Sequence, residues 1–517
     1  MLKFQFLYIL IELLVTVRGE ALDPLTDQIV LYKKRNNVSR TYMTTSNGAR
    51  VEYNDLVTLN SRIIYNNYFM DSITHVDRQI IPERVVHGKG SGAFGYLEVT
   101  DDVSKYTKAD FLNEVGKKTP VAVRFSLGGG ERGSSDGTPG GLRGFAVKFY
   151  TKEGNFDILG INTPMFAFKD PVLFPNFIHT QGRNPATNVP DPNMVWDFFT
   201  RYPTTLNMFL RLFGNAGTPK GYRYMPGHAI HTYQVQNKNG DIYFVRFHFM
   251  PENGKESITT EQASQLDPDS FTRDLYEAIA CGKRVAWNFG IQVLTKEQAF
   301  NAKIDVFDTT LELPFQDYPI TPVGKLVLNR NPLNFFAEVE QLAFCPCNLV
   351  PGIDGSPDKL FEGRMFSYRD TQNYRLGINH KNIKVNCPFE TVARTYNRDG
   401  VAPVEYNGKD SPNYYENSFN GPVAYYDVKR SKLVKIKQEK ANNFEQIAKS
   451  YLDMDEDEKD VVITNIVNSL GPAIDSLRDK AVKIFTEIEK DLGNRIKKGL
   501  EGFSREPVCN MTLDSCS

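Results

Sequence analysis

The sequence lacks an excess of charge of either sign, and it contains few histidines. Its 61 Lys and Arg residues are balanced by 62 Asp and Glu residues, so the 517-residue chain has a formal net charge of −1. Without a basic excess nothing indicates a polyanion partner, and we therefore expect no nucleic-acid partner. The composition, with 41% hydrophobic and 24% charged residues, is that of a globular protein. Because only seven histidines are present, a site that uses one is easy to inspect.

Long apolar runs are absent after the first twenty residues. There, Lys3 and the apolar run over residues 4–17 predict a secretory signal peptide at 1–20, cleaved after Gly19 or Ala21. The alternative is a membrane anchor, but a run of roughly 14 residues is too short to span a bilayer. We therefore expect no membrane span and a protein that is secreted or lies in the lumen of the secretory pathway. Glycosylation sequons at Asn37 and Asn510 fit an exported chain.

Cysteines are also few, six in all. Cys509 and Cys516 lie in a short polar tail and are expected to close a small loop in an oxidising compartment. The stretch Cys345-Pro346-Cys347 is also typical of a metal or redox pair, but no second cluster accompanies it. We expect a structural role for it, with a disulfide to Cys281 or Cys387 as one possibility.

Short strands dominate the sequence from about residue 85, after a polar stretch over residues 21–84 that predicts an extended N-terminal arm with one short helix. Strands with apolar alternation or apolar runs, separated by long irregular excursions, predict an antiparallel barrel. One excursion, over residues 193–213, has a partly helical pattern. The predicted strands span residues 96–100, 121–127, 145–151, 156–161, 229–236, 242–250 and 286–295.

Three further segments complete an α+β chain. Residues 332–436 are rich in Pro, Asn and Tyr and poor in periodicity, so we expect them to wrap over other structure or across subunits. Residues 437–501 carry apolar side chains at helical spacing, including Val461 and Ile474, and predict three or four amphipathic helices. Residues 502–517 form a tail.

Within the wrapping segment, Pro357 and Asp358 open a stretch that we expect to be helical for one or two turns on either side of Tyr368. Arg364 and Tyr368 are four residues apart and share a helix face. A guanidinium favours the phenolate form of a neighbouring tyrosine, and tyrosine can hold haem iron from the proximal side. Taken alone, the stretch more simply indicates a helical tyrosine packed beside a surface arginine.

A second candidate stretch places His87 between a β-branched pair and a glycine-rich turn, where a flat ligand could approach the backbone. Taken alone, it indicates a core histidine. Nearby, Gly128, Gly130 and Gly133 satisfy the spacing of a dinucleotide-binding loop, but residues 134–139 cannot start the helix that such a loop requires. We therefore expect no nucleotide there.

Considered together, several stretches resemble the haem catalase family over about residues 60–420. The chain has no flavodoxin-like domain after its helical end, so it resembles the small-subunit type. The resemblance implies an eight-stranded antiparallel barrel over residues 85–331, a ferric haem assumed to be b-type, a homotetramer with threaded arms, and conversion of hydrogen peroxide to water and oxygen. The stretches that carry it lie at residues 82–87, 143–150, 170–175 and 322–332.

The resemblance also implies a role for each residue of the site. His87 would be the distal acid–base, because an imidazole exchanges protons readily near neutral pH, and Ser126 would orient its ring. Tyr368 would ligate the iron, with Arg364 holding it as phenolate and His231 behind Arg364. The residues expected against the porphyrin and its propionates are Val86, Phe174, Arg84, Arg124 and Arg375.

Three features depart from the family pattern. Ile161 stands where the family has an asparagine that holds peroxide, and one such hydrogen bond is worth about 1.5–3 kcal/mol, or roughly ten- to a hundredfold in rate. Asn162 follows it but should point elsewhere. Asp136 is displaced from the family's access-channel aspartate, which predicts a wider and less polarised channel. We expect no NADPH, because the family's dinucleotide positions are here Asn207, Arg211, Ala216, Pro226, His228, Leu313 and Phe315.

Two classes of function remain open at this point. The first is a catalase whose dismutation is slow enough for organic hydrogen donors to compete. The second is a haem-binding protein of the same fold with vestigial catalysis and a carrier or structural role. A third reading, rearrangement of fatty-acid hydroperoxides, is a minor alternative. The pairing of His87 with Ser126 favours the first, because haem binding alone does not need both residues.

Overall fold

The computed structural model describes residues 23–36, 41–59, 62–401, 405–439 and 443–503. The predicted signal peptide, both sequons and the Cys509–Cys516 loop lie outside these ranges. The chain divides into two units, Met1–Pro82 with Tyr276–Lys283, and Glu83–Leu275 with Arg284–Ser517. None of the helices in the described ranges has the length and apolar character needed to cross a membrane.

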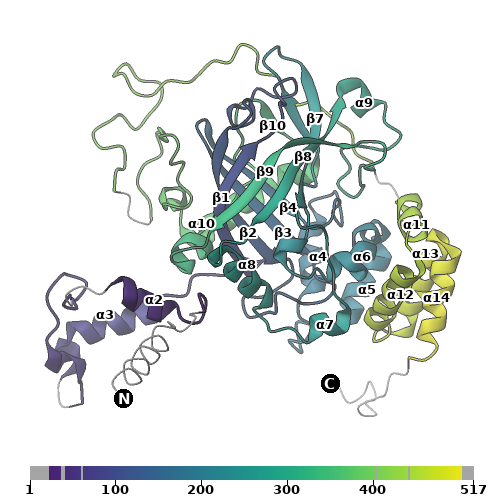
Figure 1. Ribbon diagram of the computed structural model, residues 1–517, viewed down its shortest axis with the longest axis horizontal. Helices are drawn as coiled ribbons and strands as arrows, with labels where there is room; N and C mark the ends of the chain where they lie inside the picture. Colours follow the sequence, from purple (N-terminus) through teal and green to yellow (C-terminus); the bar gives the residue numbers. More distant parts are fainter. Residues whose placement is uncertain (1–22, 37–40, 60–61, 402–404, 440–442, 504–517) are drawn as a thin grey trace, which may run out of the picture. The chain divides into compact units, whose positions relative to one another are not determined.

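A closed antiparallel barrel of eight strands forms the centre of the larger unit (Figure 1). Around the barrel the strands follow the order β1, β2, β3, β4, β5, β7, β8 and β9, and β9 pairs with β1 to close it. Two short strands, β6 and β10, extend the sheet beside β7. The bounds are β1 Gly90–Val99, β2 Lys118–Leu127, β3 Arg143–Thr151, β4 Gly154–Ile161, β5 Gly227–His228, β6 Tyr233–Gln236, β7 Ile242–Pro251, β8 Val285–Thr295, β9 Ile320–Arg330 and β10 Ile353–Gly355.

Aromatic side chains from several strands of the barrel fill part of the core. The rings of Phe145 and Phe249 stack with centroids 5.1 Å apart, and those of Phe249 and Phe289 stack at 4.8 Å. All three side chains are at most 1% exposed. Such burial accounts for the apolar alternation that predicted most of the strands.

The closing strand β9 has no counterpart among the predicted strands, because Pro322 and Gly324 interrupt its pattern. Glycine is required at this seam. A Cβ on Gly95 of β1 would lie 1.9 Å from the carbonyl oxygen of Val327 in β9, and a Cβ on Gly324 would lie 2.3 Å from that of Glu98. The residues that obscure the strand in the sequence therefore allow the two backbones to approach.

Four C-terminal helices pack beside α5 and α6 (Figure 1), as predicted in type and number. One detail of the prediction is wrong: Val461 and Ile474 are each 42% exposed, whereas Val462 is fully buried, so the apolar face is shifted by one residue there. The helices of this region are α4 Leu173–Gln181, α5 Pro192–Arg201, α6 Leu206–Phe213, α11 Phe444–Leu452, α12 Glu456–Leu470, α13 Asp475–Ile488 and α14 Lys490–Leu500.

In the smaller unit, the arm has two α-helices rather than the single short helix expected, α2 (Gln28–Arg35) and α3 (Asn67–Val76). The other α-helices in the described ranges are α7 Thr260–Ser264, α8 Ser270–Ala280, α9 Lys296–Phe300 and α10 Lys359–Leu376.

Cys345 and Cys347 form a disulfide with one another. The possible pairing with Cys281 or Cys387 was therefore wrong, and both of those cysteines are free. The turn at Pro346 explains the outcome, because it brings the two Cα atoms to 5.1 Å, within the range that a disulfide spans.

Candidate active site

One face of the site is built around His87, just before β1. Its Nδ1 lies 2.9 Å from the hydroxyl oxygen of Ser126 on β2, and its backbone N–H donates to the carbonyl of Gly128. The backbone is held at a φ of 63°, in the left-handed region that a histidine rarely adopts. A Cβ on Gly144 of β3 would lie 2.4 Å from the Ser126 oxygen and 2.8 Å from His87 Nδ1. The pair therefore needs a glycine at position 144.

The surroundings of His87 favour its neutral form. Burial, together with the positive charges of Arg124, Arg364 and Arg84, lowers the pKa of His87 to about 3. A neutral imidazole has one nitrogen with a free lone pair, so it can accept a proton. The site thus presents a base that is uncharged at physiological pH and fixed by a neighbouring hydroxyl.

Helix α10 carries a second set of predicted site residues and begins and ends as its capping residues predict. Asp358 is the N-cap and accepts a hydrogen bond from the N–H of Phe361 at 2.8 Å, and Gly377 ends the helix at a φ of 87°. The helix is 18 residues long and extends nine residues before Tyr368 and eight after it, slightly more than the one or two turns expected on either side. A Cβ at Gly363 would lie 2.7 Å from Pro171, so this glycine allows the helix to approach the segment before α4.

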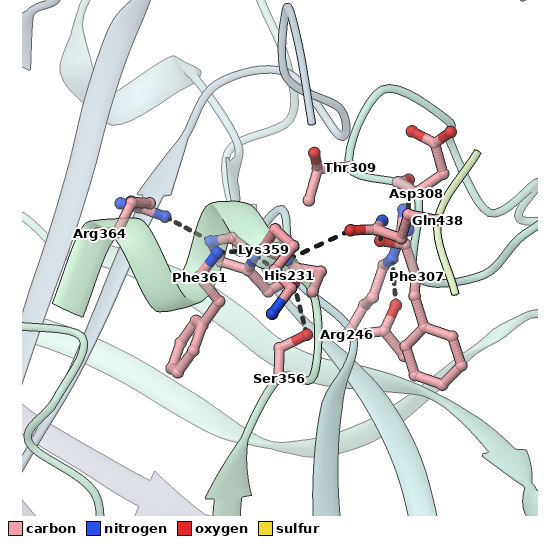
Figure 2. Close-up of polar contacts among 12 residues, drawn as sticks. His231, Arg246, Phe307, Asp308, Thr309, Ser356, Lys359, Phe361, Arg364 and Gln438 are labelled. Atoms are coloured by element: carbon pink, nitrogen blue, oxygen red, sulfur yellow. Dashed lines mark hydrogen bonds and ion pairs between the residues drawn. The ribbon is translucent and has the colours of Figure 1, made fainter. Parts of the chain in front are cut away.

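A continuous chain of hydrogen bonds leads from Ser356 through Asp358, His231 and Arg364 to Tyr368. Figure 2 shows how Ser356, His231 and Arg364 lie in this chain. Arg364 donates to the Tyr368 hydroxyl at 3.1 Å and to His231 Nε2 at 2.8 Å. On its other side, His231 Nδ1 lies 2.8 Å from a carboxylate oxygen of Asp358, to which the hydroxyl of Ser356 also donates. His231 lies where the predicted strand 229–236 is broken between β5 and β6.

The donors in this chain fix the tautomer of His231. Because a guanidinium only donates hydrogen bonds, Nε2 of His231 must accept, and Nδ1 must donate to Asp358. Burial lowers the pKa of His231 although Asp358 opposes it, so the ring is neutral. Burial also acts to lower the pKa of Arg364, but the oxygens of Tyr368, Tyr233 and Asp358 outweigh it and raise that pKa. Arg364 is therefore a permanent cation beside the phenol.

Three arginines and one carboxylate form a further cluster. Glu340 is 3.5 Å from Arg84 and 3.0 Å from Arg375, and Arg124 donates to the carbonyl of Gly88. Burial lowers the pKa of Arg124 to about 10 and that of Arg84 well below its ordinary value. Two buried atoms of this cluster, Arg84 Nη1 and Arg124 Nε, have no hydrogen-bond partner within the part of the chain that the structure describes.

This cluster leaves two positive charges unbalanced. Buried charges and orphaned donors are unfavourable without a partner, so the cluster fits a ligand with two carboxylates. Haem carries two propionates, and the donor set therefore fits haem.

The predicted site residues fall into three groups in the structure. His87 is joined to Ser126, Tyr368 to Arg364 and His231, and Arg84 and Arg375 to one another through Glu340. Val86 directly precedes His87, and Phe174 lies in the first turn of α4; both side chains are half-buried. Among the described residues, Phe174 has no ring pair with the other site residues.

Sequence reasoning missed Glu340, Ser356 and the second role of Asp358. Asp358 was recognised only as the start of a helix, which was the one signal available.

Ile161 is the last residue of β4, where it pairs with Gly144 and with His228. Its side chain is 7% exposed. The amide of Asn162 accepts from the N–H of Arg143 and donates to the carbonyl of Ala216, at 2.9 and 2.7 Å. The prediction that Asn162 is engaged elsewhere is therefore confirmed.

The other two features that depart from the family pattern are Asp136 and the dinucleotide positions, and the side chains there bond to other parts of the protein. Asp136 is fully buried and accepts hydrogen bonds from the N–H groups of Phe271 and Thr272 in the first turn of α8. At the dinucleotide positions, Arg211 forms an ion pair with Glu312 at 2.7 Å. Asn207 donates to the carbonyl of Thr310 and to Gln446, and His228 is hydrogen-bonded to His248.

The barrel, with a histidine–serine pair at one place and an arginine-held tyrosine at another, defines the class of haem-type peroxide oxidoreductases. Comparison with known proteins narrows that class. Residues 44–421 match the family model described as "Catalase", and residues 437–500 match the model described as "Catalase-related immune-responsive". The chain belongs to the catalase family.

Individual relatives span nearly the whole chain. The catalase of Ascaris suum is 43% identical over 92% of this chain and 91% of its own length. Catalase-A of Dictyostelium discoideum is 46% identical over 90% of this chain and 97% of its own length. The catalase of Rattus norvegicus is 41% identical over 95% of this chain and 96% of its own length. The structure of catalase A from Saccharomyces cerevisiae is similar with a TM-score of 0.84 and 37% identity, covering 89% of this chain and 99% of that one.

Proposed function

We propose that this protein is a haem-dependent catalase that converts two molecules of hydrogen peroxide to two of water and one of oxygen, at a reduced rate. The observation that carries the proposal is the 2.9 Å contact between His87 and Ser126 in a chain that also holds Tyr368 by Arg364. A haem carrier needs the tyrosine but has no use for an oriented base.

His87 is the proton shuttle in this proposal. Peroxide cleavage needs a base that takes a proton from one oxygen and returns it to the other. The neutral imidazole can accept that proton, and Ser126 keeps the ring in one orientation. Once protonated, the ring is close to the charges of Arg84, Arg124 and Arg364, which favour return of the proton.

The other groups hold the cofactor. Tyr368 would hold the iron as phenolate, stabilised by the permanent charge of Arg364, and an anionic ligand would favour the ferric state. Arg84, Arg124 and Arg375 would bind the propionates. The bound haem supplies the two-electron redox chemistry that no side chain of the protein can supply.

The reduced rate rests on Ile161. The branched apolar side chain of Ile161 offers no hydrogen bond to peroxide, and the neighbouring amide of Asn162 is already engaged. Loss of one hydrogen bond to a reacting group is worth about 1.5–3 kcal/mol, or roughly ten- to a hundredfold in rate. Organic hydrogen donors therefore compete better here. The alternative, a haem-binding protein with vestigial catalysis, is favoured by the same residue.

Oxygen evolution by haem-loaded protein, before and after Ile161→Asn, distinguishes these functions. We expect measurable oxygen release from the parent and an increase of roughly ten- to a hundredfold in the variant. Ile161→Val is the matched control, because it keeps the site apolar and should change the rate little. A parent as fast as the variant contradicts the role given to Ile161, and two inert proteins favour the carrier function.

The proposal includes secretion, a homotetramer and the absence of bound NADPH. Exposed aromatic side chains support the assembly, since Tyr425 and Tyr426 are 86% and 81% exposed in the wrapping segment and Tyr53 is 84% exposed in the arm. Light scattering on purified protein tests the tetramer. N-terminal sequencing of the mature protein, expected to begin after Gly19 or Ala21, tests secretion. Release of NADPH when the purified protein is denatured would contradict the proposed absence of bound NADPH.

A further inference from the structure

A row of positive charges lies near the end of the wrapping segment. Residues 429–437, Lys-Arg-Ser-Lys-Leu-Val-Lys-Ile-Lys, contain five cations and no acidic residue. The net charge of −1 for the whole chain hides this local excess. Basic runs of this length are typical of polyanion-binding surfaces. We call the cations of this row the basic strip: Lys429, Arg430, Lys432, Lys435 and Lys437.

The backbone of the strip is held against the barrel. The buried Gln234 of β6 accepts from the N–H of Val434 at 2.9 Å and donates to the carbonyl of Lys432 at 3.1 Å. Val434 and Ile436 pack against an apolar cluster around Phe244. Just past the strip, Gln438 contacts the carbonyl of Phe307 and the N–H of Lys359 (Figure 2). The strip is therefore a fixed part of the surface.

This anchoring turns the cations outward. Ser431, Val434 and Ile436 are half-buried, whereas Lys432, Lys435 and Lys437 are exposed. Extended chain advances about 3.3 Å per residue, so consecutive exposed cations follow one another at roughly 7–10 Å. The result is a line of charges on a fixed backbone.

Few acidic groups neutralise the line. Asp427 is paired with Lys108 at 2.6 Å, and Lys437 is paired with Glu439 at 2.6 Å. Among the described residues, Arg430, Lys432 and Lys435 have no carboxylate within ion-pair distance.

The β6–β7 hairpin adds further cations beside the strip. Lys429 donates to the carbonyl of Lys238 in this hairpin at 3.1 Å, and Asn237 donates to the carbonyl of Lys105 at 3.0 Å. The side chains of Lys238 and Lys105 are both exposed. The positive surface therefore continues past the strip itself.

We propose that the basic strip binds a linear sulfated polysaccharide. A flexible chain with repeated sulfate groups can follow a line of fixed cations by ion pairing alone. Single-stranded nucleic acid is normally held by stacking on aromatic side chains as well, and residues 429–437 contain none. Duplex readout uses a helix or a two-stranded ribbon in the groove, and the strip is neither. The site would hold a secreted enzyme on a sulfated extracellular matrix.

The test compares two triple variants of the full-length, haem-loaded protein for binding to heparin. Arg430→Gln, Lys432→Gln and Lys435→Gln remove the three cations of the strip that have no carboxylate within ion-pair distance among the described residues. The matched control removes three exposed cations of α14 instead, through Lys490→Gln, Lys497→Gln and Lys498→Gln, with the same change in net charge. Oxygen evolution by each variant shows that the site is intact, since neither set touches it.

We expect the parent and the control to bind heparin alike and the strip variant to bind at least about tenfold more weakly. The slope of log affinity against log salt should fall by about three, roughly one per cation removed. Equal loss in both variants, or no binding by the parent, overturns the proposal. Equal binding to desulfated heparin, or to single-stranded DNA of the same charge, also overturns it, because the strip would then not select sulfated chains.

Discussion

Replacing Asp358 with asparagine separates the two roles of this side chain, helix cap and hydrogen-bond partner of His231. One oxygen of Asp358 caps α10, and the other faces His231 Nδ1 at 2.8 Å. Asparagine is as good an N-cap as aspartate, so the helix start is retained. Its amide N–H₂ then faces His231, which must accept at Nδ1 and carry its proton on Nε2. That proton points at the donating N–H of Arg364, and the chain to Tyr368 is broken.

The magnitude follows from the bonds that are lost. The carboxylate is fully buried, and a hydrogen bond to a charged group is worth about 1.5–3 kcal/mol. We expect Asp358→Asn to lower the free energy of unfolding by about that amount, measured by urea denaturation of the haem-free protein. Transfer of haem from the loaded protein to excess apomyoglobin should be about tenfold faster or more, because a loss of about 1.4 kcal/mol is a factor of ten.

Ser356→Ala is the matched control for this substitution. It removes one hydroxyl donor to Asp358 at 2.5 Å but keeps the carboxylate, so the free energy of unfolding should also fall by about 1.5–3 kcal/mol, whereas haem transfer should change little. If Asp358→Asn unfolds within about 0.5 kcal/mol of the parent and holds haem as long, the chain of hydrogen bonds does not support Tyr368 and the reasoning is refuted.

Further predictions concern the other parts of the site. Gly144→Ala places a Cβ 2.4 Å from Ser126 and should lower oxygen evolution by about a hundredfold through misplacement of His87; Gly133→Ala, where the Cβ meets nothing, should be neutral by the same assay. Glu340→Gln leaves the arginine cluster without its carboxylate and should lower the free energy of unfolding of the haem-free protein by about 3–5 kcal/mol, measured by urea denaturation. An unchanged urea midpoint would show that Glu340 does not balance the charges of the three arginines. Because the pKa of His87 falls from 6.5 to about 3 on folding, the unfolded state binds more protons between these values. The free energy of unfolding should therefore be highest above pH 6.5 and should fall as the pH drops toward 3, less steeply in His87→Asn than in the parent. Equal slopes of this free energy against pH in the two proteins would show that His87 does not cause the pH dependence.

The sequence predicted what depends on neighbouring residues and missed what depends on distant ones. The helix around Tyr368 and its capping by Asp358 are local features, and four-residue spacing was enough to place Arg364 beside the phenol. Glu340 ends a short helix, Phe336–Glu340, and its partners Arg84 and Arg375 lie far from it in sequence. Only the folded chain shows that it neutralises them.

Strand and helix registers show the same limit. Strand β9 was missed because its proline and glycine, Pro322 and Gly324, break the alternation, although Gly324 is required for contact with β1. In the C-terminal helices, Val461 and Val462 are adjacent apolar residues, and the sequence could not decide which of them faces the core. Packing against α5 and α6 decides it.

The seam between β1 and β9 has a consequence for the order in which the protein matures. The strand that follows His87 is the first of the barrel, and its neighbour across the seam ends at Arg330, more than two hundred residues later in synthesis. Tyr368 emerges from the ribosome later still. A nascent chain therefore lacks both the closed barrel and the proposed iron ligand until most of it has been made, so under the proposed function haem capture follows translation of α10.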